Sequence, residues 1–158
     1  MKRRELFSSL FSSQEKEETV IIRPPYYKDK SSFDKACYEC EGMCSKVCEE
    51  NIITMLEDKT PSINFDKNGC TYCDECAKAC EFGVLELEYK KKIDLAFEID
   101  MLKCLSWNNT MCFSCKDPCL DEAIDFLAMF RPSINDSCTS CGFCINVCPT
   151  DAISYKKV

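Results

Sequence analysis

Sixteen cysteines occur in this chain of 158 residues, and their spacing constrains the fold more than any other feature does. They form four groups of four along the sequence. The groups are Cys37, Cys40, Cys44 and Cys48; Cys70, Cys73, Cys76 and Cys80; Cys104, Cys112, Cys115 and Cys119; and Cys138, Cys141, Cys144 and Cys148. The second and fourth groups follow the pattern C-x2-C-x2-C-x3-C without deviation. Ordinary globular proteins contain far fewer cysteines, so the fold is expected to be organised around these thiols.

The spacing favours iron–sulfur clusters over the two other uses of dense cysteines. A 4Fe–4S cube needs one thiolate at each iron corner, and cysteines two residues apart wrap a tight loop around one face of it. Tetrahedral zinc is typically bound by two C-x2-C pairs that are well separated in sequence. Disulfide scaffolds belong to oxidising compartments. We therefore interpret all sixteen cysteines as ligands of four 4Fe–4S clusters, with zinc and disulfides as alternatives.

The first and third groups depart from the regular spacing. Three residues separate Cys40 from Cys44, and seven separate Cys104 from Cys112. Loops accept such insertions at a small entropic cost, so both groups are still expected to bind clusters. The long insertion leaves open whether Cys104 is a ligand. It also contains Trp107, which is expected either to shield its cluster from solvent or to be an ordinary surface aromatic.

Composition excludes several classes of function. Histidine is absent, which removes haem held by histidine, Rieske-type clusters and a Cys-His catalytic pair. The net charge of −7 argues against nucleic acid as a partner, because phosphate binding needs clustered Lys and Arg. No apolar run is long enough to span a membrane. One metal would suffice to staple so small a fold, so four clusters favour electron transfer over a purely structural role. The chain has no histidine, no cysteine pattern of an open-coordination cluster and no nucleotide-binding loop, so an enzyme is not expected.

The chain repeats itself beyond the cysteines. The tetrapeptide PSIN occurs at residues 61–64 and 132–135, each time just before an intact cysteine group. An apolar pair also follows shortly after the last cysteine of every group. We therefore predict an α+β fold of two tandem modules, with short strands and helices packed around the clusters. The modules are assigned to residues 35–100 and 101–158, after a basic amphipathic segment and charged linker at residues 1–34.

Alternating apolar and polar residues predict the strands of these modules. In the first module they are residues 53–57, 62–65, 85–89 and 93–99, and in the second they are residues 124–127 and 153–155. A polar DKTP turn separates the first two strands. Brief helices are expected around residues 77–80 and 145–148. Such a chain has little apolar core, so folding and cluster assembly are expected to be coupled.

Residues 35–158 resemble the bacterial two-cluster 4Fe–4S ferredoxin module, present twice. In that family the fourth cysteine of each group binds the cluster of the neighbouring group. The resemblance therefore implies these ligand sets: Cys37, Cys40, Cys44 and Cys80; Cys70, Cys73, Cys76 and Cys48; Cys104, Cys112, Cys115 and Cys148; and Cys138, Cys141, Cys144 and Cys119. The family's proline after the fourth cysteine is kept only at Pro149, whereas Glu49, Glu81 and Leu120 replace it elsewhere. Glu49 and Glu81 are expected to lower the potential of a nearby cluster if they are close and ionised.

A more specific resemblance rests on RRELFSSLF, CDECAKAC, CLSWNNTMCFSC and CTSCGFCINVCP. Together these stretches resemble the NapF family, ferredoxin-type proteins encoded with periplasmic nitrate reductases. The resemblance implies a cytoplasmic protein that contacts the precursor of the molybdenum-containing nitrate reductase catalytic subunit before its export. Its implied role is maturation of that subunit, with electron transfer. The alternative is an electron-transfer subunit of another oxidoreductase complex.

The first residues, MKRRELFSSLF, pair two arginines with regularly spaced apolar residues. The segment lacks the apolar stretch of an export signal, and dense thiolates fit a reducing interior. It is instead expected to form an amphipathic helix that docks a partner. Alternatives are an unstructured tail with chance periodicity and a helix associated peripherally with a membrane surface. The candidate partner-binding residues are Arg3, Arg4, Leu6, Phe7, Leu10 and Phe11.

Overall fold

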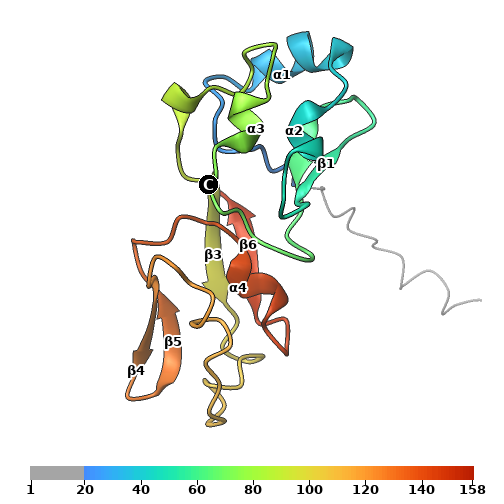
Figure 1. Ribbon diagram of the computed structural model, residues 1–158. Helices are drawn as coiled ribbons and strands as arrows, with labels where there is room; N and C mark the ends of the chain where they lie inside the picture. The colour runs from blue at the N-terminus through green and yellow to red at the C-terminus, as the bar shows by residue number, and fades with distance from the viewer. Residues whose placement is uncertain (1–19) are drawn as a thin grey trace, which may run out of the picture.

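The computed structural model describes residues 20–158, which form two lobes stacked end to end (Figure 1). The first lobe, residues 20–92, contains α1 (Ser31–Ala36), the 3-10 helix η1 (Cys37–Glu39), α2 (Met43–Lys46), β1 (Ile53–Met55), β2 (Pro61–Ile63), α3 (Glu75–Lys78) and the 3-10 helix η2 (Leu87–Tyr89). The second lobe, residues 93–158, contains β3 (Leu95–Ile99), β4 (Ile124–Leu127), β5 (Phe130–Ile134), α4 (Phe143–Asn146) and β6 (Ile153–Lys157). The candidate partner-binding residues at the N-terminus lie outside the described residues.

The repeated PSIN tetrapeptide occupies the same place in both lobes. It forms the second strand of an antiparallel hairpin, where Ile53 pairs with Ile63 in the first lobe and Ile124 pairs with Ile134 in the second. In both copies the final asparagine side chain accepts a hydrogen bond from the backbone N–H two residues later. This local turn ends the strand and directs the chain into the next cysteine loop. The internal repeat read from the sequence is therefore visible in the structure.

Strand β3 joins the second lobe through its hydrogen bonds. It pairs antiparallel with β6 from Leu95 opposite Lys157 to Ile99 opposite Ile153. The sequence-based division assigns these residues to the first module, with a boundary between residues 100 and 101. That division remains a prediction, but the sheet partner of β3 is the last strand of the chain.

The α-helices that follow three of the cysteine loops begin in the same way. In each, a residue with a positive φ precedes the helix, and the third cysteine of the group is the second helical residue. The positive-φ residues are Gly42 (72°) before α2, Asp74 (70°) before α3 and Gly142 (90°) before α4. A left-handed residue is needed here to turn the chain sharply out of the loop. These short helices therefore serve to aim cysteines rather than to build a helical layer.

The largest fully buried side chains lie almost entirely in the first lobe. Tyr26, Phe33 and Phe65 are the largest fully buried residues, and Pro24, Pro25 and Pro61 are also fully buried there. Residues 20–23 run beside β2, where the Ile63 N–H donates to the Ile22 carbonyl (2.7 Å). This apolar packing gives the first lobe a polypeptide core of its own.

The observed elements confirm most of the predicted strands and helices. Strands β1, β2, β3, β4 and β6 fall within or beside the predicted ranges, as do α3 and α4. The prediction of a strand over residues 85–89 is wrong, because residues 87–89 form the 3-10 helix η2. Helix α1, η1, α2 and strand β5 were not predicted. Within residues 20–158 no helix has the length and apolar character needed to cross a bilayer.

Candidate metal centres

The sixteen cysteines are all free thiols, and most of them gather around three cavities. Each cavity is lined by four cysteines: Cys48, Cys70, Cys73 and Cys76 in the first lobe; and Cys119, Cys138, Cys141 and Cys144, and separately Cys104, Cys112, Cys115 and Cys148, in the second. Three members of every set come from one sequence group and the fourth comes from the other group of the same lobe. The fold therefore brings together the exchanged sets that the ferredoxin resemblance implies.

The remaining four cysteines also lie close together. Cys37 and Cys44 are buried, and burial raises the pKa of each thiol to about 11. Neighbouring thiols, among them Cys40 and Cys80, contribute to the raised pKa of both. Cys80 belongs to the second sequence group, so the exchange of the fourth cysteine recurs here. All four predicted sets are thus neighbours in space.

The walls of the three cavities are mostly apolar. Ile52, Ile53 and Ile63 line the cavity of the first lobe, and Ile99 and Ile153 line that of Cys104. Burial raises the thiol pKa of Cys76 and Cys144 to about 12. Because a thiolate is the ligand form, metal binding at these sites must release protons from buried thiols.

Backbone N–H groups point at several of the thiols. The fourth cysteine of three groups accepts such a bond: Cys80 from Leu85 (3.4 Å), Cys119 from Ala123 (3.3 Å) and Cys148 from Ala152 (3.2 Å). Within the loops, Cys40 accepts from Gly42 and Cys138 from Ser140, both at 3.4 Å. Donors aimed at sulfur stabilise the negative charge of a thiolate-bound cluster and set its potential.

The donor set and its arrangement fit a 4Fe–4S cube. Within residues 20–158, no three acidic, histidine or cysteine side chains are arranged closely enough to hold one metal ion. A cube does not require such an arrangement, because each of its four thiolates binds a different iron corner. Four thiols around an apolar cavity, with N–H donors behind them, suit that geometry. Ligation by the individual cysteines remains a prediction.

The stretched third group folds so that its first cysteine reaches the site. Cys104 lines the same cavity as Cys112, Cys115 and Cys148. The Ser106 hydroxyl donates to the Cys112 carbonyl (3.0 Å) and so closes the inserted loop. Trp107 is half-buried beside the cavity rather than in its lining, and its indole N–H donates to the carbonyl of Pro132 (3.0 Å), which does line it. Trp107 therefore supports the wall of this cavity from outside.

One residue directly follows the last cysteine of each group, and these four residues have different surroundings. Pro149 lines the cavity of Cys104, and Glu49 lines the cavity of Cys70 in the first lobe. Glu49 and Glu81 are both exposed, and Leu120 is 82% exposed at the groove between the lobes. Glu49 is therefore placed to add a negative charge at a cluster site.

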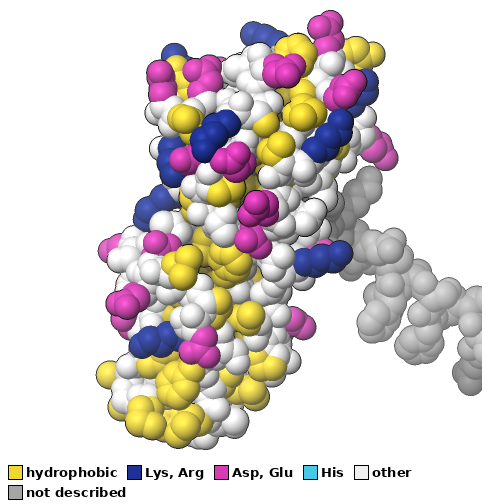
Figure 2. Space-filling view, viewed as in Figure 1, with side chains coloured by type: hydrophobic (Ala, Val, Ile, Leu, Met, Phe, Trp, Pro, Cys, Tyr) yellow, Lys and Arg dark blue, Asp and Glu magenta, His cyan; other side chains and the backbone are white. Residues whose placement is uncertain are grey.

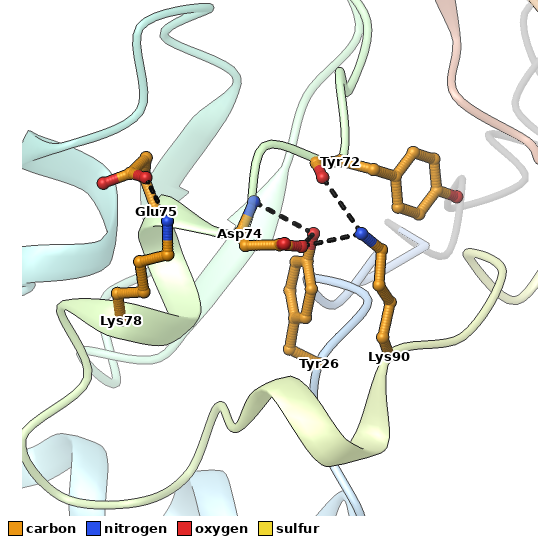
Figure 3. Close-up of polar contacts among 6 residues, drawn as sticks. All are labelled: Tyr26, Tyr72, Asp74, Glu75, Lys78 and Lys90. Atoms are coloured by element: carbon orange, nitrogen blue, oxygen red, sulfur yellow. Dashed lines mark hydrogen bonds and ion pairs between the residues drawn. The ribbon is translucent and has the colours of Figure 1, made fainter.

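A polar network fixes the loop of the second group (Figure 3). The Tyr26 hydroxyl donates to the Asp74 carboxylate (2.8 Å), and Lys90 pairs with the same oxygen (2.7 Å) and donates to the carbonyl of Tyr72. The hydrogen bond from Lys90, followed by that from Tyr26, lowers the pKa of Asp74. Burial and the bond to Asp74 raise the pKa of Tyr26. The network holds Asp74 in its left-handed conformation between Cys73 and Cys76.

Sequence reasoning missed this network. Tyr26 lies before the first cysteine group, and no local pattern connects it with Asp74 or Lys90. The only signal is that Asp74 takes the place of Gly42 and Gly142 in the other loops, so a polar residue must be stabilised where glycine is favoured.

Comparison with known families defines the class of protein. The sequence model of a 4Fe-4S dicluster domain matches residues 36–84, and that of a 4Fe-4S binding domain matches residues 133–154. The chain is thus an iron–sulfur protein of the ferredoxin type. The third cysteine group lies outside both matched ranges.

Similarity to individual proteins shows which family within this class the chain belongs to. The ferredoxin-type protein NapF of Escherichia coli K12 is 35% identical over 85% of this chain and 84% of its own length. The ferredoxin-type protein NapF of Haemophilus influenzae is 32% identical over 95% of this chain and 87% of its own length. The chain belongs to the NapF family, and the resemblance inferred from its motifs is confirmed.

A third relative has a different description. One component of the Na(+)-translocating ferredoxin:NAD(+) oxidoreductase complex of Acetobacterium woodii is 29% identical over 87% of this chain. The match covers only 46% of that component. This chain is thus also similar to part of a protein that is named as a component of a redox complex.

Proposed function

We propose that this chain binds four 4Fe–4S clusters and transfers electrons during maturation of the catalytic subunit of periplasmic nitrate reductase. In this proposal it acts in the cytoplasm on the molybdenum-containing precursor before export, and it is not itself an enzyme. The single observation that supports cluster binding is the set of three cavities. Each cavity is lined by three cysteines of one group and one cysteine of another. The role in maturation is supported by membership of the NapF family.

The chemistry of the chain's own residues supports electron transfer rather than catalysis. When bound, a 4Fe–4S cluster accepts and releases one electron. The protein supplies thiolate ligands, N–H donors to sulfur and apolar walls, which together set the potential of the cluster. Four such centres within one small chain extend the distance over which electrons can pass.

The partner is tested by affinity capture. The tagged full-length chain, purified anaerobically from cytoplasm, is expected to carry the nitrate reductase precursor with it. A variant with Cys70, Cys73 and Cys76 replaced by serine separates recognition from cluster content. If the precursor is absent from captures in which the iron content is full, the maturation role is wrong.

The second candidate function is electron transfer within another oxidoreductase complex. The similarity to the Acetobacterium woodii protein favours it, because that protein is named as part of a redox complex. Capture of membrane quinol-oxidising proteins instead of the precursor would support this alternative. It leaves the proposal for four clusters unchanged.

The N-terminal segment is a separate part of the proposal. Deletion of residues 1–14 is expected to abolish capture of the precursor and to leave the iron content unchanged, because every cysteine lies beyond the deletion. Replacement of Leu6, Phe7, Leu10 and Phe11 by serine tests the apolar face alone. Capture that survives both changes would place the docking site on the lobes.

A further inference from the structure

The two lobes meet at a seam formed by two cysteine loops, residues 69–72 and 139–143. The Cys70 N–H donates to the Cys141 carbonyl (2.6 Å), and the Tyr72 hydroxyl donates to the Thr139 carbonyl. Both cysteines also line one groove between the lobes. Cys70 belongs to the cavity of the first lobe and Cys141 to a cavity of the second. The contact therefore links one predicted cluster site of each lobe directly.

Two glycines make this contact as close as it is. A Cβ at Gly69 would lie 2.5 Å from the backbone nitrogen of Phe143 and 2.6 Å from the carbonyl oxygen of Cys141. These are backbone atoms, so an alanine here could be accommodated only if the two loops moved apart. A Cβ at Gly142 would lie 2.2 Å from the ring of Phe65. Each glycine belongs to one lobe and allows the other lobe to approach.

Aromatic packing and further polar contacts also hold the two lobes together. Phe65 of the first lobe lies 6.2 Å from Phe97 and 6.0 Å from Tyr155, between ring centroids, and so packs on the sheet of β3 and β6. The Ser140 hydroxyl donates to the Leu95 carbonyl (2.6 Å), and the Asn146 side chain donates to the Lys67 carbonyl. These contacts fix the orientation of the lobes rather than leaving them on a loose linker.

The predicted sites follow one another in a row across the seam. In the first lobe, α2 carries Cys44 and packs against α3, which carries Cys76. Cys70 then contacts Cys141, whose neighbour in the same cavity is Cys144. In the second lobe, α4 carries Cys144 and contacts β6, whose Ile153 lines the cavity of Cys115. The order places the sites of Cys70 and Cys141 in the middle of the row.

We propose that the contact of Cys70 with Cys141 is the electronic junction between the lobes, and that Gly69 is a positioning residue that keeps it closed. This inference rests on the proposed electron-transfer function. If the sites of Cys70 and Cys141 each hold a 4Fe–4S centre, one electron would pass from the reduced centre at Cys70, which would be oxidised by one electron, to the oxidised centre at Cys141, which would be reduced by one electron. No protein bond forms or breaks in this exchange, and the initial reductant in the test is dithionite.

The test uses the full-length holoprotein with Gly69→Ala, and Gly83→Ala as the matched control. A Cβ at Gly83 meets only the flexible end of Glu86 at 3.4 Å, but the φ of Gly83 is 65°, so an alanine there is strained in its own backbone. Gly83→Ala therefore controls for local backbone strain in the first lobe without a substitution in the seam loops. Iron content and hydrogen exchange at the Cys70 amide are measured first. Gly69→Ala is expected to keep its iron and to lose protection of that amide, whereas Gly83→Ala is expected to keep both.

Electron paramagnetic resonance of the dithionite-reduced proteins then reports magnetic interaction between the lobes. Two reference variants, each with the cysteines of one lobe replaced by serine, give the spectrum of each lobe alone. The unmodified spectrum is expected to differ from the sum of these references, and Gly69→Ala is expected to match that sum. Where a reference variant fails to fold, the relaxation rates of Gly69→Ala and Gly83→Ala are compared directly, with slower relaxation expected for Gly69→Ala.

Two results would overturn the junction. One is an unmodified spectrum equal to the sum of the two lobes, and the other is a Gly69→Ala protein whose Cys70 amide exchanges freely while its interaction spectrum is unchanged. Neither result depends on a nitrate reductase partner, so failure of the maturation role is seen separately in the capture experiment. Absence of iron from the unmodified protein would remove the proposed function itself.

Discussion

The two lobes repeat the same cysteine loops but differ in how much apolar side chain they bury. Tyr26, Phe33 and Phe65 are buried in the first lobe, where residues 20–36 add packing that the second lobe lacks. The second lobe exposes large apolar residues at its far end, which Figure 2 shows gathering at the bottom of the molecule. The exposed large apolar residues of this lobe include Met101 (56% exposed), Leu102 (90%), Met111 (61%), Leu127 (68%) and Met129 (54%).

This difference shows how much of each lobe depends on what its thiols bind. A small domain buries too little apolar surface to offset the entropy of ordering its chain. The first lobe compensates with its aromatic and proline core. The second lobe buries Ile93, Leu95, Phe97, Ile124 and Ile153, and three of these, Phe97, Ile124 and Ile153, line the cysteine cavities. Its order is therefore expected to depend more strongly on bound clusters.

Removal of iron is expected to produce the largest difference between the two lobes. Anaerobic chelation is expected to abolish hydrogen-exchange protection in β4, β5 and β6, because the second lobe loses the centres around which it packs. Protection in β1 and β2 is expected to fall but to remain measurable. Mass spectrometry of peptides from both lobes gives the comparison. Equal loss of protection in the two lobes would show that the aromatic core gives no independent stability.

Replacement of Cys104 tests the stretched third group. Cys104→Ser and Cys112→Ser are both expected to lose the iron of one cluster, because each residue lines the same cavity. Met111→Ser, in the same insertion and 61% exposed, is the matched control and is expected to retain all iron. Iron analysis distinguishes the three variants. Full iron in Cys104→Ser would mean that another ligand completes this site.

Replacement of Glu49 is expected to have a smaller effect, on the reduction potential of one cluster in the first lobe. Glu49→Gln is expected to raise the potential of the nearby cluster on the order of tens of millivolts, because removal of a negative charge favours the reduced, more negative cluster. Glu81→Gln is expected to have a smaller effect, since Glu81 lines none of the three cysteine cavities whereas Glu49 lines one. Redox titration followed by paramagnetic resonance measures both. Equal shifts in the two variants would contradict the special position of Glu49.

The smallest expected effect concerns the polar network of the first lobe. Tyr26→Phe removes the hydrogen bond to Asp74 and is expected to cost about 1 kcal/mol, or roughly a fivefold faster release of iron from that lobe in denaturant. Tyr38→Phe is the control, because Tyr38 is 69% exposed. The second lobe is expected to release its iron at an unchanged rate in both variants.

The parts of the fold that depend on local spacing could be predicted from the sequence. The DKTP turn between two short apolar runs indicated the first hairpin, and the spacing of the cysteines indicated four groups of ligands. Strand β5 of the second hairpin was not predicted, although the repeated PSIN lies in it. The family exchange implied that Cys80 and Cys148 join sites of other groups, and the structure brings them there. Long-range relations could not be read in this way. Examples are the pairing of β3 with β6, the placement of Tyr26 beside Asp74 and the closeness of Gly69 to Phe143.

The incorrectly predicted strand shows the limit of periodicity. Leu85, Leu87 and Tyr89 alternate with Glu86 and Glu88, which is the pattern of a half-buried strand. In the structure Leu85 is buried, but Leu87 is 49% exposed in a 3-10 helix. The Glu86 N–H donates to the Tyr26 carbonyl and the Lys91 N–H to the Pro25 carbonyl, so a segment before the first cysteine group fixes this stretch.

The iron and acid-labile sulfide content of the anaerobically purified full-length chain decides whether both lobes hold clusters. Four 4Fe–4S clusters predict one iron and one sulfide for each of the sixteen cysteines, divided equally between the two lobes. Stoichiometric zinc without sulfide would contradict them. So would an iron content that is full in the first lobe and absent from the site of Cys104, because the two lobes would then not be copies of one cluster-binding module.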